Sequence, residues 1–272
     1  MASAKDIVVK PISSSAANAL VKRVHYSGKV VNNSQLHLGV FLDERLEGAM
    51  QFGPSLDKRK IQGIVEGTLW NGFIELNRMA FSDRLPRNSE SRALGVAFRI
   101  MKKNYPHIEW IVSFADGAQC GDGTIYRAAG FVLTGIKRND QIWQAPSGEI
   151  FSRMSLTDQR SKQQQAQAAQ VLSRTTVTKG KHIPKTGGSS MSAFKAAGWQ
   201  PLSGYQLRYI YFLNPEARKR LAVPIIPFSK IDEMGAGMYK GKPKRDKQAM
   251  AGNHLAQRQC NADRHAPSSQ SA

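Results

Sequence analysis

Four side chains lie where chemistry is often done, at the ends of predicted strands and helices. Asp116 follows the apolar run 109–115, Tyr126 lies in a short predicted helix beyond it, and His25 and Tyr26 end an earlier predicted helix. In α/β sheets, ligands bind at the carboxyl ends of the strands. We therefore interpret Asp116 as a proton acceptor, and Tyr126, His25 and Tyr26 as further candidates for base, acid or substrate contact.

Each of these residues also has a plainer interpretation. Aspartate often begins a turn, and a histidine at a helix C-terminus is favoured there by the helix dipole. Cys120 is a lone loop cysteine with no spaced partner, which is usually incidental. The residue types alone leave both interpretations open.

A second group of side chains is suited to bind an anion. Arg78 lies inside the strand-like run 73–81, where a guanidinium group needs an anionic ligand or an ion-pair partner such as Glu75. The next loop opens a helix, whose free amides and positive dipole end suit a phosphate, although a solvated cap has the same composition. The candidate cofactor ligands are Arg78, Arg87, Asn88, Ser89 and Ser91.

The helices and strands that must position these residues are predicted from the spacing of apolar residues and from the residues that begin and end helices. The helix that starts at 13–15 and ends with His25 and Tyr26 is expected to bury Ala17, Leu20, Val21 and Val24, and the helix opened at 88–89 to bury Leu94, Ala97, Phe98 and Met101. Asp122 is expected to cap the short helix that Gly130 ends. The basic run 57–60 is read as a turn or a DNA contact. Strands are expected at 7–9, 37–42, 46–52, 73–81, 109–115, 131–134, 141–144, 149–155 and 206–213.

This order resembles the acyl-coenzyme-A-binding core of the GNAT acetyltransferase superfamily, although the glycine-rich pyrophosphate loop of that superfamily is absent. A set of short motifs is similar, more closely, to the bacteriophage Mom family of DNA adenine-modifying proteins over roughly residues 5–213. The motifs are His25-Tyr26-Ser27, Glu75-Leu76-Asn77-Arg78, residues 85–92, residues 103–107, Ser113-Phe114-Ala115-Asp116 and Gly123-Thr124-Ile125-Tyr126.

The resemblance implies an α/β fold, with a GNAT-like mixed central sheet flanked by helices. The modification domain is expected over 1–235. The strand pattern places an insertion at 139–200 before the last strand, a possible DNA contact, and the composition of 236–272 predicts a basic tail that is disordered. The resemblance also implies a carbamoylmethyl (glycinamide-like) group placed on the exocyclic amino nitrogen of adenine, which protects phage DNA from host restriction.

Acetyl-CoA is the cofactor and double-stranded DNA the partner that the resemblance implies, with a homodimer as a further expectation. It also raises an iron-assisted route with His25, Tyr26 and Asp116 as candidate ligands, although no facial-triad spacing is present. The expected location is the cytoplasm of the bacterial host. Neither a signal peptide nor a membrane span is found in the sequence.

Charge supports a polyanionic partner. The net charge is +19, and residues 1–156 carry 20 Lys and Arg against 14 Asp and Glu, whereas residues 157–272 carry 19 against 6. Nucleic acid is the leading partner for such a chain. Two cysteines cannot form a disulfide framework and suit a reducing compartment.

Three functions remain open at this level. The leading one is a DNA adenine carbamoylmethyl transferase. The second is an ordinary GNAT N-acetyltransferase acting on an amine of a protein or small molecule, and the third is a non-enzymatic phage DNA-binding protein.

Overall fold

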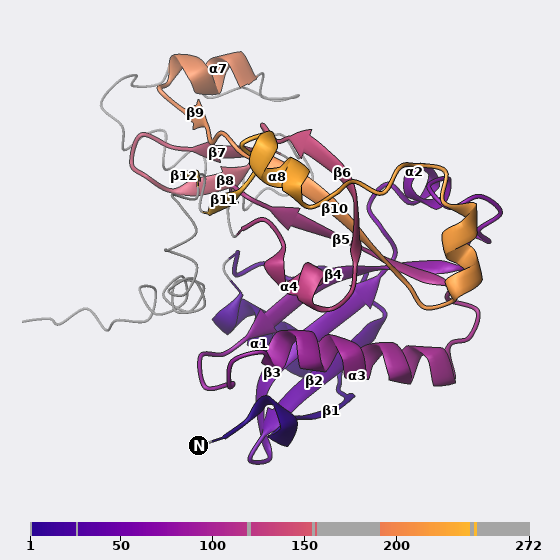
Figure 1. Cartoon of the computed structure of the whole chain (residues 1–272). Coiled ribbons are helices and arrows are strands. Elements are labelled where there is room, and N and C mark those ends of the chain that lie inside the picture. Colours follow the sequence, from indigo (N-terminus) through magenta and orange to yellow (C-terminus); the bar gives the residue numbers. More distant parts are fainter. Residues whose placement is uncertain are drawn as a thin grey trace, which may run out of the picture.

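A seven-stranded mixed sheet forms the centre of the computed structural model, which describes residues 2–25, 27–118, 121–153, 156, 191–239 and 242–243 (Figure 1). The strand order is β1-β2-β3-β4-β5-β10-β6, and β4 and β5 form the parallel pair. The strands are β1 (Val8–Pro11), β2 (Leu36–Leu42), β3 (Arg45–Gly53), β4 (Phe73–Phe81), β5 (Trp110–Asp116), β10 (Tyr205–Phe212) and β6 (Val132–Arg138).

Helices cover both faces of this sheet. The helices are α1 (Ser14–Val24), α2 (Lys58–Gln62), α3 (Ser89–Asn104), α4 (Thr124–Ala128), α7 (Met191–Ala196) and α8 (Ser229–Glu233), with 3-10 helices η1 (Ala4–Asp6) and η2 (Pro215–Arg220). The main apolar cluster joins α3 to one face, whereas α1, α2 and η2 pack on the other. All eight apolar residues predicted to face the core from α1 and α3 are buried.

The β2–β3 hairpin forms as predicted, because two consecutive residues accept left-handed backbone angles. Asp43 and Glu44 have φ of 48° and 62°, and Leu42 pairs with Arg45 across them. Two left-handed residues match the twist of the flanking strands, and Asp tolerates this conformation well. The hairpin therefore supplies the antiparallel part of the sheet beside β4.

The parallel pairing of β4 with β5 is short. It joins Phe73, Ile74 and Glu75 to Trp110, Ile111 and Val112, and the pairing ends there although both strands continue. The carboxyl-terminal halves of the two strands therefore diverge. Loop 82–88 and the N-terminus of α3 follow from the end of β4, which is the same end of the sheet as the end of β5.

A register shift between β3 and β4 overturns one prediction. Gln51 pairs with Arg78 and Phe52 with Leu76, so Asn77 is the extra residue of a bulge. The strict alternation that the run 73–81 predicts would put Arg78 on the same face as Ile74 and Leu76. Because the bulge shifts the alternation by one residue, Arg78 lies instead on the face of α1 and α2.

The described part of the chain between β6 and β10 forms a small sheet of its own, within the range 139–200 that was predicted to be an insertion. Its three-stranded sheet has the order β8-β7-β9, from β8 (Ile150–Ser152), β7 (Ile142–Gln144) and β9 (Gln200–Pro201). An aromatic cluster around Trp143, Phe194 and Trp199 fills it. Gly198 ends α7 with φ of 84°, as Gly130 ends α4 with φ of 86°.

The strand order and the helices on both faces of the sheet confirm the predicted α/β class.

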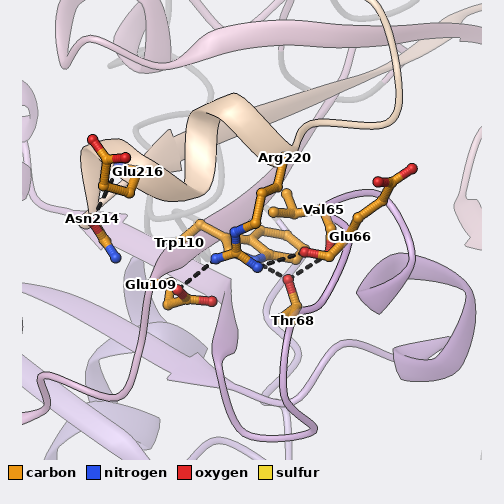
Figure 2. A network of polar contacts seen from close by, with 8 residues as sticks. All are labelled: Val65, Glu66, Thr68, Glu109, Trp110, Asn214, Glu216 and Arg220. Atoms are coloured by element: carbon orange, nitrogen blue, oxygen red, sulfur yellow. Dashed lines mark hydrogen bonds and ion pairs between the residues drawn. The ribbon is translucent and has the colours of Figure 1, made fainter.

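The connection 54–72 between β3 and β4 is fixed against η2 by a polar network (Figure 2). Arg220 reaches the Glu109 carboxylate at 2.6 Å and the Glu66 carbonyl at 2.5 Å. The indole of Trp110 donates to the Thr68 hydroxyl at 3.0 Å. These bonds join three parts of the sequence that are far apart, so the connection has a defined shape.

Two local predictions need correction. Residues 58–60, read as part of a turn, begin α2, whose Ile61 is buried in the cluster below it. Gly123, with φ of 80°, is the N-cap of α4 in place of Asp122, because Asp122 is buried one residue earlier. Several parts of the chain named above lie outside the described residues: Tyr26, Cys120, most of the insertion and residues 244–272 of the basic tail. Of the described helices, none is long and apolar enough to cross a membrane.

Candidate active site

A polar group interrupts the apolar face of β4 between two clusters. Phe73 packs below α2 and Ala80 packs below α1. Glu75 and Arg78 lie between them on the same face, at the point where β4 leaves β5. This location makes the middle of β4 the first part of the candidate site.

Arg78 is held by backbone carbonyls. Its Nε donates to the Lys29 carbonyl at 3.1 Å, and its Nη1 donates to the Asn77 carbonyl at 2.8 Å. Partial burial, and then the neighbouring Arg78 cation, lower the pKa of Lys29. Arg78 therefore anchors the loop that follows α1 to the centre of the sheet, a role that the sequence did not indicate.

Glu75, which the sequence indicated only as an ion-pair partner of Arg78, is a partly buried titratable group of this site. Burial raises the pKa of its carboxyl, and hydrogen bonds from Ser55 and Asn77 and the charge of Arg78 oppose that rise. Asn77 in turn accepts a hydrogen bond from the Ser34 hydroxyl at 3.1 Å. Gly53 leaves the space that this arrangement needs, because a Cβ there would lie 2.6 Å from Asn77 Oδ1. The sequence feature that could have indicated this group is a carboxylate inside the otherwise apolar run 73–81.

His25 is the C-cap of α1, and its ring is oriented by the next turn. The Ser27 amide donates to Nδ1 at 3.2 Å, and the Ser27 hydroxyl lies 2.8 Å from the same nitrogen. Since a backbone N–H can only donate, Nδ1 is the acceptor and the neutral ring carries its proton on Nε2. In this state Nε2 donates a hydrogen bond, which suits substrate contact better than proton abstraction.

Asp116 is the last residue of β5. Its Oδ1 accepts a hydrogen bond from the Ala118 amide at 3.0 Å, and its carbonyl accepts one from Gly121 at 3.2 Å. Alternation along β5 puts Asp116 on the face of Phe114 and Val112, which is also the face of Glu75 and Arg78. The carboxylate thus builds the turn and also lies at the ligand-binding end of the strand.

Tyr126 lies on the other face of the sheet, in an aromatic cluster. Its ring centroid is 5.3 Å from those of Phe131 and Tyr209. The Tyr209 hydroxyl donates to the Asp122 carbonyl at 2.5 Å, and burial strongly raises the pKa of that hydroxyl. An ion pair of 3.5 Å from Arg127 to Asp122 completes the surroundings of α4.

The loop before α3 is built by its own side chains. Glu47 receives hydrogen bonds from Ser82 at 2.5 Å and an ion pair from Arg84 at 3.0 Å. The hydroxyls of the predicted ligands Ser89 and Ser91 donate to the carbonyls of Pro86 at 2.7 Å and Asn88 at 3.2 Å. Asn88 is the N-cap with φ of 70° and makes no side-chain cap hydrogen bond, while the Arg87 and Asn88 side chains are exposed.

Ser113 supplies a further signal that the sequence did not reveal. Its hydroxyl is fully buried and has no hydrogen-bond partner among the described residues. Ser113 is the first residue of β5 beyond the parallel pairing with β4. A buried, unsatisfied hydroxyl costs about 1–3 kcal/mol, so a polar ligand group entering between the diverging strands would remove that cost.

A metal site gains no support from the side chains. Across the ranges that the structure describes, no group of three or more His, Cys, Asp or Glu could hold a metal ion. Of the three residues considered as iron ligands, Tyr26 lies outside the described residues, so this comparison concerns His25 and Asp116 only.

Comparison of the sequence with known proteins identifies the family of this chain. The model of the Mom protein family matches residues 6–230. The methylcarbamoylase mom of Escherichia phage Mu is 34% identical over 220 residues, which are 80% of each chain. This chain belongs to the Mom protein family.

Solved acetyltransferase structures also resemble the chain. A Bacillus subtilis acetyltransferase in complex with CoA is 9% identical, with a TM-score of 0.37 over 76% of this chain and 97% of its own. An IAA acetyltransferase from Bacillus cereus is 12% identical, with a TM-score of 0.37 over 76% of this chain and 99% of its own.

Proposed function

We propose that this protein modifies adenine in phage DNA, adding a carbamoylmethyl group to the exocyclic amino nitrogen and so protecting the DNA from host restriction. The observation that carries the proposal is the family match over residues 6–230, together with the name of the phage Mu relative. Double-stranded DNA is the substrate, and the net charge of +19 favours that partner.

Acetyl-CoA is the proposed source of the two-carbon unit. The amides at the start of α3 and the exposed Arg87 would hold its pyrophosphate. Its pantetheine arm would enter between β4 and β5, where the Ser113 hydroxyl is available to a carbonyl or amide of the arm. Ser89 and Ser91 would act by fixing the loop, because their hydroxyls already donate to loop carbonyls.

The adenine amino group is a weak nucleophile, since its lone pair is conjugated with the ring. Asp116 is proposed to accept a proton from it while the nitrogen forms its new bond to carbon. His25, Tyr26 and Tyr126 are proposed to contact the base or the transferred group. Compared with acetyl transfer, this product needs two further changes. An amide nitrogen must replace the sulfur at the thioester carbonyl, which releases coenzyme A as its thiol. The bond from the adenine nitrogen to the methyl carbon replaces a C–H bond, whose two electrons must pass to an external two-electron oxidant.

Nucleoside mass analysis of DNA from cells that express the chain tests the proposal. The expected result is an adenine nucleoside heavier by one carbamoylmethyl group. An N-acetylated adenine would favour ordinary acetyl transfer to DNA, and acetylation of proteins or small amines alone would favour the acetyltransferase alternative. DNA binding with unmodified nucleosides would favour a non-enzymatic DNA-binding protein.

A further inference from the structure

The loop after α1 and the connection 54–72 meet on the α1 face of the sheet. The Asn33 side chain donates to the Pro54 carbonyl at 3.3 Å, and the Gln35 amide donates to the Phe52 carbonyl at 2.7 Å. The junction lies directly over the polar group of β4, because Ser34 bonds Asn77 and Ser55 bonds Glu75. The two segments therefore form one continuous rim above the candidate site.

Cations flank this junction on both sides. The stretch 7–42 contains four Lys or Arg and no Asp or Glu. Its exposed cations Lys22, Arg23 and Lys29 lie at the end of α1 and in the loop after it. On the other side α2 presents Lys58, Arg59 and Lys60, with Asp57 just before them. The rim therefore has a strong excess of positive charge.

Apolar side chains are exposed between and beside these cations. Leu56 is 80% exposed although it directly follows the buried Ser55. Trp70 is 50% exposed, and the Lys58 ammonium lies 4.5 Å from its ring centroid and 3.1 Å from Asn71 Oδ1. Side chains of this kind beside cations are what proteins insert into a base stack, with phosphates bound at either side.

We propose that this rim is the surface that binds duplex DNA. In this arrangement Lys22, Arg23, Lys29, Lys58, Arg59 and Lys60 contact phosphates, and Leu56 enters the base stack beside the adenine to be modified. An enzyme that acts on an exocyclic amino group must first displace the base from the stack. The displaced base would then face Glu75 and Arg78. The inference rests on the proposed function and assigns its DNA surface.

The test compares two variants of the full chain with equal loss of charge. One replaces Lys22, Arg23, Arg59 and Lys60 by Ala, and the other replaces Arg92, Arg99, Lys102 and Lys103, which are exposed on α3 at the opposite face. Binding to a fluorescent duplex is measured by anisotropy over a range of salt concentrations. Alanine favours helix, so both variants are expected to keep the wild-type circular dichroism spectrum.

The rim variant is expected to bind about a hundredfold more weakly at low salt, with the slope of log K against log salt reduced by about 3–4. The α3 variant is expected to stay within about threefold of wild type. Equal losses in the two variants would mean that only total charge matters, and unchanged binding by the rim variant would also overturn the proposal.

Leu56→Ser tests base displacement separately. On a duplex whose adenines are replaced by 2-aminopurine, wild-type protein should increase fluorescence by unstacking the base, and the variant should lose most of that increase while binding within about threefold. An undiminished increase would refute the insertion of Leu56. A wild-type dimer that Leu56→Ser converts to a monomer would identify the rim as a protein interface instead.

Failures of the two proposals can be told apart. DNA binding through the rim without modified adenine in expressing cells would refute the proposed function alone. Modified adenine made by wild type, together with unchanged DNA binding by the rim variant, would refute the DNA surface alone.

Discussion

Two carboxyl groups of this site lie on the same sheet face in different surroundings. Asp116 lies at a strand end, where its Oδ1 accepts a hydrogen bond from the Ala118 amide. Glu75 lies inside the sheet, where burial raises the pKa of its carboxyl, and hydrogen bonds from Ser55 and Asn77 and the charge of Arg78 oppose that rise. The two groups can therefore be tested separately, Asp116 through the reaction and Glu75 through the pH dependence of stability.

Asp116→Asn separates the catalytic role from the turn. Asparagine keeps an Oδ1 that can accept the Ala118 amide, so the turn should form and DNA and cofactor binding should persist. Because the proton acceptor is lost, the amount of modified adenine should fall by on the order of a hundredfold or more. Nucleoside mass analysis measures the product. Near-normal modification would make Asp116 a turn residue and leave His25, Tyr26 and Tyr126 as candidates.

Glu75→Gln should change how stability depends on pH. A carboxyl whose folded-state pKa is raised contributes stability that is full at low pH and is lost as pH rises through the folded pKa. The glutamine variant should therefore unfold at a higher temperature than wild type at pH 7, and the difference should shrink as the pH falls toward 4.5 and below. Thermal unfolding at several pH values measures this, and parallel curves for the two proteins would contradict the raised pKa.

At the scale of elements, the start of α3 is the proposed anion site. Its side-chain hydroxyls are used to build the loop, which leaves backbone amides and the exposed Arg87 for a ligand. The absence of glycines is thus compatible with a phosphate site, because Asn88 takes up the left-handed conformation before the helix.

Arg87→Ala should weaken acetyl-CoA binding by about tenfold, because one charge-assisted hydrogen bond to the pyrophosphate is lost. Lys103→Ala, with the same loss of charge at the far end of α3, is the matched control and should leave the Kd unchanged. Isothermal calorimetry measures both. Equal heats and affinities for wild type and Arg87→Ala would move the pyrophosphate away from this loop.

The positions of helices and strands could be predicted from the sequence, whereas the hydrogen-bond partners of the side chains could not. Helical spacing identified the buried faces of α1 and α3, and β10 was recognised by its alternation. The bulge at Asn77 could not be seen, because it depends on how β3 pairs with β4. The hydrogen bonds from Arg78 to the carbonyls of Lys29, in another segment, and of its neighbour Asn77 could not be predicted for the same reason, whereas the charge of Arg78 does act on the predicted partner Glu75.

At the scale of the whole molecule, Arg220 links the connection 54–72, which forms one side of the rim, to the sheet. Its guanidinium joins the connection 54–72, the residue before β5 and η2 through Glu66, Glu109 and its own backbone (Figure 2). This arrangement holds the far end of the rim without using any residue of the candidate active site.

Arg220→Met keeps the length of the side chain and removes these bonds. Stability should fall by about 1–3 kcal/mol, because the Glu109 carboxylate and the Glu66 carbonyl lose their partner. For a chain of this size that corresponds to a Tm lower by roughly 2–10 °C. Differential scanning calorimetry measures the change, with Lys219→Met, whose partner Glu216 is exposed, as the control. An equal Tm for both variants would mean that the network contributes no more than a surface pair.

The short pairing of β4 with β5 makes the sheet two half-sheets, β1 to β4 and β5 with β10 and β6, joined by a seam of three residue pairs. Beyond that seam, the facing edges have backbone amides that no neighbouring strand of the sheet protects. These amides should exchange with deuterium faster than their neighbours in free protein, and a pantetheine arm lying along them should slow their exchange in both half-sheets at once. The cofactor would then act as a missing strand, so that loading the enzyme also completes its sheet.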